Sequence, residues 1–215
     1  LLGLNGAGKT TSIGKIANKL RKEGKKVIAM IAPAMMGQLP CTPKQLKEAI
    51  MKLGFADVYE VAQGADVTTK TEAAEFTERL EHGAEFMTTS CCAGYNELVE
   101  KHIPEMKPFR SDTKTPLYYT AEIVKKEIPD AVTVFFSPCV AKRREALQNP
   151  NVDYVLNYEE VGAWFVALNI QVAECGESEF KTEASAEARL LCDRRSCKSS
   201  PNIASGRNSG SSCNC

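Results

Sequence analysis

The segment Val27-Ile28-Ala29-Met30-Ile31 is a short, uninterrupted apolar run, one of several such runs that decide the fold. Between these runs lie stretches whose apolar residues repeat at helical spacing. Strands and helices that alternate in this way are typical of βαβ units around a parallel sheet, so the sequence predicts an α/β fold. The expected strands are Leu1–Leu4, Val27–Ile31, Val58–Val61, Phe86–Thr88, Ala131–Phe136 and Tyr154–Leu156, and the expected helices are Thr10–Lys22, Pro43–Leu53, Thr69–Leu80, Tyr95–His102, Pro116–Glu127 and Glu160–Ala167.

The overall composition is that of a globular protein with no bias towards charged partners. Of the 215 residues 43% are hydrophobic, and 27 basic side chains balance 27 acidic ones. The chain therefore has no net charge that would attract it to nucleic acid or to an anionic membrane. No apolar run reaches the roughly 18 residues of a membrane span, and the N-terminus lacks signal-peptide order. We expect a soluble, cytoplasmic protein, and the start inside an apolar run without Met suggests a fragment.

Nine cysteines require an explanation, because disulfides are rare in a reducing compartment. Metal or redox chemistry is the leading interpretation for the clustered ones. Cys41 and Cys175 stand alone in the sequence and are expected to act as small apolar residues. The tail from Cys192 has no aromatic residue and no hydrophobic period, so residues 189–215 are expected to be disordered rather than to form a zinc site.

The N-terminal region contains a phosphate-binding motif. The segment Gly3-Leu4-Asn5-Gly6-Ala7-Gly8-Lys9-Thr10 satisfies GxxxxGK[ST] between an expected strand and an expected helix. Its backbone N–H groups and the helix N-terminus would surround a phosphate, with Lys9 at the outer phosphates and Thr10 at magnesium.

This region, residues 1–28, resembles the signal-recognition-particle family of GTPases. The resemblance implies binding of GTP and Mg²⁺ by Gly3, Asn5, Gly6, Gly8, Lys9, Thr10 and Thr11. Further motifs of that family are absent: Ile31-Ala32-Pro33-Ala34 replaces an Asp-Thr-Tyr-Arg-like segment, and Thr69-Lys70-Thr71 lacks the guanine-reading aspartate. Phosphate binding is therefore expected without efficient GTP hydrolysis.

Two cysteine motifs follow expected strands. Thr89-Ser90-Cys91-Cys92 comes directly before an expected helix, and Ser137-Pro138-Cys139 ends the run Ala131–Phe136. Ligands of α/β proteins gather at the carboxyl edge of the parallel sheet. Adjacent thiols point apart in extended backbone, so one of Cys91 and Cys92 is expected to ligate metal while the other does chemistry. Two thiols from separate strand ends would form half of a four-cysteine iron–sulfur site.

These motifs resemble the catalytic domain of iron-only hydrogenases. The resemblance covers Ala32-Pro33-Ala34, the TSCC motif Thr89–Cys92, the PCxAKxxE motif Pro138–Glu145 and Val152–Leu156, and it continues through Glu159-Glu160 and an expected strand end at Ala173-Glu174-Cys175 to Ala188. It implies an iron–sulfur oxidoreductase, with residues 29–188 as a partial catalytic domain, that interconverts two protons and two electrons with H₂. A ferredoxin-like electron carrier would be its partner.

The resemblance also implies individual roles. Cys92 and Cys139 match two ligands of the 4Fe-4S part of the H-cluster, and Cys91 matches the thiol that exchanges a proton with the di-iron part. Lys142 matches a lysine that holds a cyanide ligand of iron through a charge-assisted contact. Glu145 and Glu75 match proton-relay carboxylates whose pKa partial burial is expected to raise, and Glu72 is a further candidate for this relay.

Departures from the family limit the expected activity. Ala93, Ser137 and Leu117 stand where proline, methionine and glutamine are usual, as in divergent or sensory members. A second, CxxxC-type cysteine pair is missing, so we expect an inactive or sensory protein. After Ala188 the resemblance ends abruptly, which suggests a shifted reading frame, and strands without partners suggest self-association through sheet edges. The alternatives are a GTP-binding fragment and an α/β remnant without activity.

Overall fold

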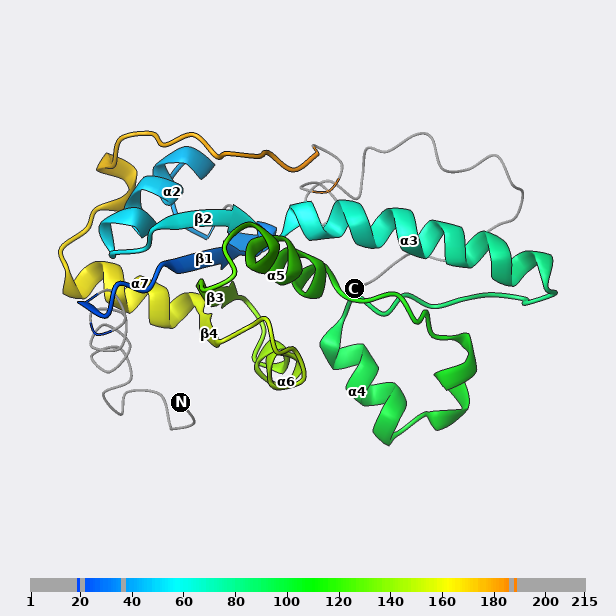
Figure 1. Ribbon diagram of the computed structural model, residues 1–215. Coiled ribbons are helices and arrows are strands. Elements are labelled where there is room, and N and C mark those ends of the chain that lie inside the picture. The colour runs from blue at the N-terminus through cyan, green and yellow to red at the C-terminus, as the bar shows by residue number, and fades with distance from the viewer. Residues whose placement is uncertain (1–18, 20–21, 36–37, 186–187, 189–215) are drawn as a thin grey trace.

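The computed structural model describes residues 19, 22–35, 38–185 and 188, and within them four parallel strands form one sheet (Figure 1). The strands are β1 (Val27–Ile31), β2 (Asp57–Glu60), β3 (Val132–Ser137) and β4 (Tyr154–Asn157). Their order is β2-β1-β3-β4, with β1 paired to both β2 and β3 and with β4 at an edge. The predicted α/β fold with parallel βαβ units is therefore confirmed.

The sheet has a hydrophobic core on each face, because the side chains of its central strand point alternately to the two sides. Val27, Ala29 and Ile31 of β1 belong to one cluster, whereas Ile28 and Met30 belong to the other. All five residues are buried, which is why the strand is a continuous apolar run rather than an alternating one.

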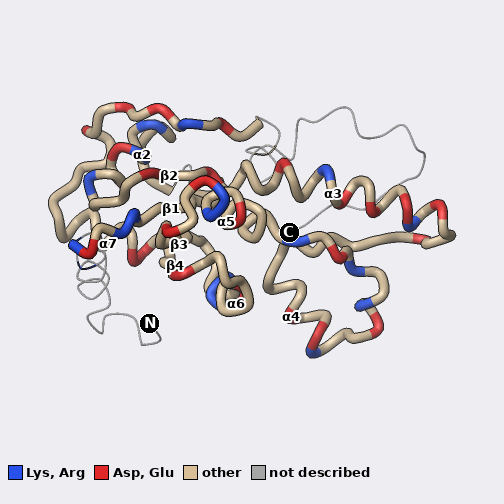
Figure 2. Tube along the Cα trace, viewed as in Figure 1, with Lys and Arg blue, Asp and Glu red and all other residues tan. Residues whose placement is uncertain are grey.

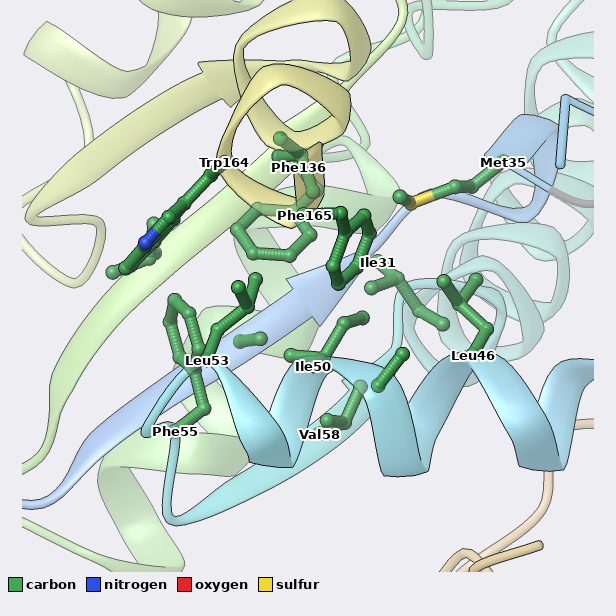
Figure 3. Close-up of a cluster of buried hydrophobic side chains, with 14 of the residues drawn as sticks. Ile31, Met35, Leu46, Ile50, Leu53, Phe55, Val58, Phe136, Trp164 and Phe165 are labelled. Carbon is green, nitrogen blue, oxygen red and sulfur yellow. The ribbon is translucent and has the colours of Figure 1, made fainter. Parts of the chain in front are cut away.

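Six helices and three 3₁₀ segments surround the sheet in the described part of the chain. They are η1 (Pro33–Met35), α2 (Pro43–Lys52), α3 (Ala62–Glu81), α4 (Ala93–Lys101), η2 (Pro104–Phe109), α5 (Pro116–Glu127), α6 (Ala141–Leu147), α7 (Tyr158–Ala167) and η3 (Val172–Glu174). Helices α2 and α7 cover one face, where Ile50 and Trp164 belong to the same buried cluster as Phe136 of β3 (Figure 3), and α5 covers the other face.

Polar caps determine where several helices begin. Thr42 caps α2 through a capping box with Gln45, and Asn157 caps α7 in the same way with Glu160. Thr115 caps α5 by accepting a hydrogen bond from the Tyr118 N–H at 3.3 Å. Each cap satisfies backbone donors that have no partner inside the helix. Pro43 and Pro116, which directly follow two of these caps, further favour a helix start.

Two of the expected local structures are wrong. The strand expected at Phe86–Thr88 does not form: Thr88 makes one isolated bridge to Arg110, because the segment runs beside the chain after η2 instead of joining the sheet. The strand end expected at Ala173–Cys175 is η3, where the Cys175 N–H bonds the Val172 carbonyl. Helix α6, which the sequence analysis did not predict, follows Cys139 and Val140 directly.

One edge of the sheet is covered by the segment that follows η3. Lys181 forms an ion pair with Asp57 of β2 at 2.9 Å, and the Ala184 N–H bonds the Glu60 carboxylate at 3.3 Å. Buried Lys47 of α2 also binds Asp57, at 2.9 Å, and donates to the Glu179 carbonyl. The expected exposed sheet edge is thus limited to β4, where Tyr154 is 38% exposed.

Helix α3 extends beyond the sheet, and residues 84–114, which include α4 and η2, form an arm that connects the far end of α3 to α5 (Figure 1). Basic and acidic residues are interspersed along both the sheet region and the arm (Figure 2). In the part of the chain that the structure describes, no helix has the length and apolarity needed to cross a membrane.

Candidate functional site

Cys91 and Cys92 lie on the surface immediately before α4. Cys92 is the N-cap of this helix, and its Sγ accepts a hydrogen bond from the Tyr95 N–H at 3.4 Å. Cys91 Sγ shares a contact of 3.7 Å with Thr89 Oγ1. Both thiols are exposed, and the helix N-terminus places partial positive charge beside the Cys92 sulfur. Exposed thiols in such surroundings are suited to metal ligation or proton exchange.

Cys139 lies just beyond the carboxyl end of β3. Its backbone is held by Ser137, whose hydroxyl accepts a hydrogen bond from the Cys139 N–H and bonds the Cys139 carbonyl, both at 3.1 Å. Ser137 is buried, whereas Cys139 is exposed. The expectation that both cysteine motifs follow strands of the sheet is confirmed for Cys139 and is wrong for the Cys91-Cys92 motif. That motif follows the extended segment between α3 and α4, which does not join the sheet.

Lys142 connects the two cysteine motifs. Its Nζ donates to the Cys91 carbonyl at 3.3 Å from the first turn of α6, and the Lys142 N–H bonds the Cys139 carbonyl at 3.2 Å. One lysine therefore contacts the chain next to Cys92 and next to Cys139. The structure brings together motifs that lie almost fifty positions apart in the sequence, as the resemblance implied.

Glu145 lies one helical turn after Lys142 and pairs with it. Lys142 Nζ and Glu145 Oε2 are 2.6 Å apart, and their side chains are only 17% and 15% exposed. The other Glu145 oxygen accepts a hydrogen bond from the hydroxyl of Thr115, the N-cap of α5. Glu145 thus joins α6 to α5 and fixes the position of the Lys142 ammonium group.

Glu75 of α3 is held by a different set of donors. Its Oε2 accepts from Ser111 Oγ at 2.6 Å, from Thr113 Oγ1 at 2.7 Å and from the Thr113 N–H at 3.2 Å. Its Oε1 accepts from the Asp112 N–H at 2.9 Å and pairs with Arg79 at 2.6 Å. Both oxygens are saturated with donors.

The expectation that burial raises the pKa of Glu75 is wrong. Burial does disfavour the charged form, but the hydrogen bonds from residues 111–113 and the Arg79 charge outweigh it and lower the pKa of this carboxyl to about 2. Glu75 therefore carries a fixed negative charge that fastens the 111–113 segment to α3. Its assignment as a relay rests on the resemblance alone.

Glu72 lies one turn before Glu75 on α3 and contacts the segment next to the cysteine pair. Its Oε1 accepts a hydrogen bond from the Ser90 N–H at 3.2 Å. Ser90 is buried, and its hydroxyl bonds the Thr113 carbonyl. Glu72 and Glu75 therefore hold two neighbouring segments of the arm against the same helix.

Sequence reasoning missed the partners of these carboxylates. Arg79 had a local signal, because it lies four residues after Glu75 on a helix. Thr115 also had one, since it precedes Pro116 at a helix start. Ser111 and Thr113 had none, because they contact Glu75 only through the fold. The expectation for lone cysteines is consistent with the core, where Cys175 is buried and Cys41 packs against the same cluster.

The thiols are of the chemical type that binds iron. Cys92 and Cys139 each carry an exposed thiol, and iron in iron–sulfur clusters is held by cysteine thiolates. Within the described residues no group of three or more His, Cys, Asp or Glu side chains is arranged to hold a metal ion. The phosphate-binding residues Gly3 to Thr11 and the cysteines from Cys192 onward lie outside the described residues.

The fold and the site define a parallel α/β protein with two adjacent exposed thiols and a partly buried lysine–glutamate pair beside its sheet. Comparison with known proteins supplies the family. The profile of the iron-only hydrogenase large subunit, C-terminal domain, matches residues 25–197. The chain belongs to this family.

Individual relatives support the assignment. The chain is 33% identical over 156 residues to the periplasmic [Fe] hydrogenase large subunit of Nitratidesulfovibrio vulgaris, covering 63% of this chain and 37% of the relative. It is 29% identical over 199 residues to an NADP-reducing hydrogenase subunit of Solidesulfovibrio fructosivorans. This match covers 78% of this chain and 34% of that relative. The chain thus spans about a third of the length of these relatives.

Solved structures show the same fold. An [FeFe]-hydrogenase of Chlamydomonas reinhardtii matches with a TM-score of 0.69 and 30% identity over 79% of this chain and 50% of its own. An [FeFe]-hydrogenase structure that concerns stepwise H-cluster assembly matches with a TM-score of 0.70 and 30% identity. This match covers 80% of this chain and 50% of that protein. The chain therefore spans half of each solved protein.

Proposed function

We propose that this chain carries half of the protein ligands of an iron–sulfur oxidoreductase that interconverts two protons and two electrons with H₂. Cys92 and Cys139 would bind the 4Fe-4S part of an H-cluster. The observation that carries this proposal is the position of Lys142: its ammonium group donates to the Cys91 carbonyl, and its backbone N–H donates to the Cys139 carbonyl. When bound, the cluster would supply the electrons and the iron chemistry.

The residues of this chain would position groups and move protons around the cluster. Exposed Cys91 lies next to a proposed ligand and has a thiol proton to exchange. Lys142, held in place by Glu145, would present a fixed positive charge to an anionic ligand of iron. Glu145 and Glu75 are the proposed relay carboxylates, with Glu72 as a further candidate, and Glu75 would also hold residues 111–113 in place.

The substitutions near the motifs support an inactive or sensory protein. Ala93, Ser137 and Leu117 replace the residues that are usual in the fast enzymes. The electron partner is proposed to be a ferredoxin-like carrier in the cytoplasm, and the exposed β4 edge is the proposed surface for self-association.

Anaerobic reconstitution of the full chain with iron and sulfide tests the proposal. The wild type is expected to bind iron and acid-labile sulfide, and Cys92→Ser and Cys139→Ser are each expected to lose most of both. Cys41→Ser is the matched control, since this thiol packs against the hydrophobic core. Near-zero iron in the wild type, or equal iron in all four proteins, would contradict the proposal.

A second proposed activity, GTP binding, rests on the Gly3–Thr11 motif alone. Lys9 would bind the outer phosphates and Thr10 would bind Mg²⁺. A fluorescent GTP analogue is expected to bind the wild type and to lose its affinity in Lys9→Ala. Equal binding by the two proteins would reject a phosphate-binding role for this motif.

A further inference from the structure

Cys175, on the side of the sheet that α2 and α7 cover, has a sulfur that contacts a lysine amine. Lys52 Nζ, on the last residue of α2, donates a hydrogen bond to Cys175 Sγ at 3.5 Å. The thiol in turn donates to the Gln171 carbonyl at 3.4 Å. Cys175 is only 6% exposed and belongs to the core cluster of that face. Its sulfur is therefore fixed in place, with a nitrogen nucleophile at contact distance.

The three lysines of α2 differ in their partners. Lys44 and Lys47 each form an ion pair with a carboxylate. Within the described residues Lys52 forms no ion pair, and its ammonium group has the Cys175 sulfur as its hydrogen-bond partner. No carboxylate therefore holds the Lys52 nitrogen away from the sulfur.

The thiols of the cysteine pair before α4 have other surroundings. The Cys91 sulfur contacts the Thr89 hydroxyl, and the Cys92 sulfur accepts from the Tyr95 N–H. Both of these thiols are exposed, whereas Cys175 is buried. In the part of the chain that the structure describes, the contact between a sulfur and a lysine amine thus distinguishes Cys175 from this pair.

Cys41 is the thiol that would compete with Lys52 for an oxidised Cys175, because it packs against the same core cluster. Burial raises the pKa of the Cys41 thiol, and the neighbouring Cys175 raises it further. At neutral pH Cys41 therefore stays protonated, and a thiol is a much weaker nucleophile than a thiolate. The Lys52 nitrogen, which already touches the sulfur, is the better placed of the two groups.

Oxidation of Cys175 would give this nitrogen a group to attack. A peroxide converts a cysteine thiol to a sulfenic acid, and a sulfenic acid condenses with a neighbouring nitrogen to a sulfenamide. In the first step the O–O bond of hydrogen peroxide breaks, an S–OH bond forms, the sulfur loses two electrons and one water leaves. In the second step the ammonium group releases a proton, its nitrogen attacks the sulfur, and the S–O bond breaks. The hydroxyl group leaves with a second proton from the nitrogen as water.

We propose that Cys175 and Lys52 are a peroxide-dependent modification site, at which Sγ and Nζ become joined in a reversible sulfenamide cross-link. The link would connect residues 123 positions apart. It would fasten the end of α2 to η3, where hydrogen bonds such as that from Gln45 Nε2 to the Ala173 carbonyl, at 3.1 Å, now hold the two together. Consumption of the sulfenic acid would also protect the sulfur from irreversible oxidation. This inference goes beyond the proposed function and does not depend on it.

The cross-link is tested by peptide mass spectrometry of the full chain without cluster. The chain is treated with hydrogen peroxide, its remaining thiols are blocked, and it is digested without reduction by a protease that cuts after glutamate. The wild type should yield the Lys52 and Cys175 peptides as one linked species, two hydrogen atoms lighter than their sum. Cys175→Ser should not yield this species. Lys52→Arg, which keeps the positive charge but lacks the amine, should instead accumulate sulfinic acid at Cys175.

Cys41→Ser is the matched control, because it removes the competing thiol and keeps the Lys52 amine. This variant should yield the linked species as the wild type does. Absence of the species from the wild type overturns the proposal. A Cys175 peptide that is joined to Cys41 instead, or oxidation products of Cys175 that are the same in Lys52→Arg and the wild type, would also overturn it.

Urea unfolding supplies a second measurement. A link between distant residues restricts the unfolded chain, so the unfolding midpoint of the peroxide-treated wild type should move to higher urea. Dithiothreitol should reverse this shift, and Lys52→Arg should not show it. Equal midpoints before and after peroxide treatment, or an equal increase in Lys52→Arg, would contradict the proposed cross-link. The result does not depend on whether the chain binds iron.

Discussion

By resemblance, Glu75 and Glu145 are both relay carboxylates. Their side chains are almost equally exposed to solvent, at 17% and 15%, but their hydrogen-bond partners differ. Five donors from Arg79 and residues 111–113 hold Glu75. Glu145 has two partners and borders a cavity. Two partly buried carboxylates of nearly equal exposure can therefore differ widely in the number of donors that hold them.

The largest expected effect is the loss of the Glu75 anchor. Glu75→Ala leaves Arg79 and the donors of the 111–113 segment without an acceptor, and we expect the free energy of unfolding to fall by about 3–5 kcal/mol. Urea unfolding measures the change. Glu78→Ala, at an exposed position on the same helix, should stay close to the wild type. A loss in Glu75→Ala as small as in this control would remove the contrast with Glu145.

A substitution at Gly64 should disturb Glu145 without disturbing Glu75. A Cβ at this position of α3 would collide with the Pro116 carbonyl and the Thr120 hydroxyl, at the start of α5. We expect Gly64→Ala to cost about 2–3 kcal/mol by overpacking and to shift the resonances of Thr115 and Glu145. Gly162→Ala is the control, because nothing lies within 4 Å of its added Cβ, and it should be neutral or slightly stabilising. Equal effects of the two substitutions would argue against close α3–α5 packing.

Removal of the Lys142 charge tests how strongly the surroundings of Glu145 stabilise the fold. Lys142→Met keeps the aliphatic stem but loses the contacts to Glu145 and to the Cys91 carbonyl. We expect unfolding free energy to fall by about 1–2 kcal/mol, less than for Glu75→Ala, because Glu145 retains Thr115 and access to water. Lys126→Met, whose side chain is 72% exposed, should have little effect. A larger loss of unfolding free energy for Lys142→Met than for Glu75→Ala would mean that the contacts of Glu145 stabilise the fold more than those of Glu75.

The smallest expected effect concerns the α5 cap. Thr115→Ala removes the N-cap bond to Tyr118 and one of the two partners of Glu145, for an expected loss of about 1 kcal/mol. Thr115→Ser keeps the hydroxyl and should recover most of the difference. Thermal unfolding of both variants decides whether the hydroxyl or the methyl group of Thr115 matters.

The sequence predicted the sheet better than the site. The strand Val27–Ile31 was predicted with its observed bounds, because a strand buried on both faces must be apolar throughout. The strand predicted at Phe86–Thr88 does not form. Phe86 is needed for another contact, because its ring stacks on Phe109 within the arm. Lys142 contacts the backbone carbonyls of Cys91 and Cys139, and the roles that the resemblance implies for these residues stay predictions. The low pKa of Glu75 was not predictable, since its partners meet only in the folded chain.

The titration of Glu75 tests most directly the claim that its five donors hold this carboxylate in the ionised form. Because its folded pKa of about 2 lies below its ordinary value of 4.5, ionised Glu75 stabilises the fold above pH 4.5 by about 3 kcal/mol, and this contribution is lost as the pH falls towards 2. In ¹³C NMR spectra assigned with Glu75→Gln, its carboxyl resonance should keep the ionised position from pH 7 down to pH 4 and begin to move only below that. A midpoint at or above 4.5 would contradict the account.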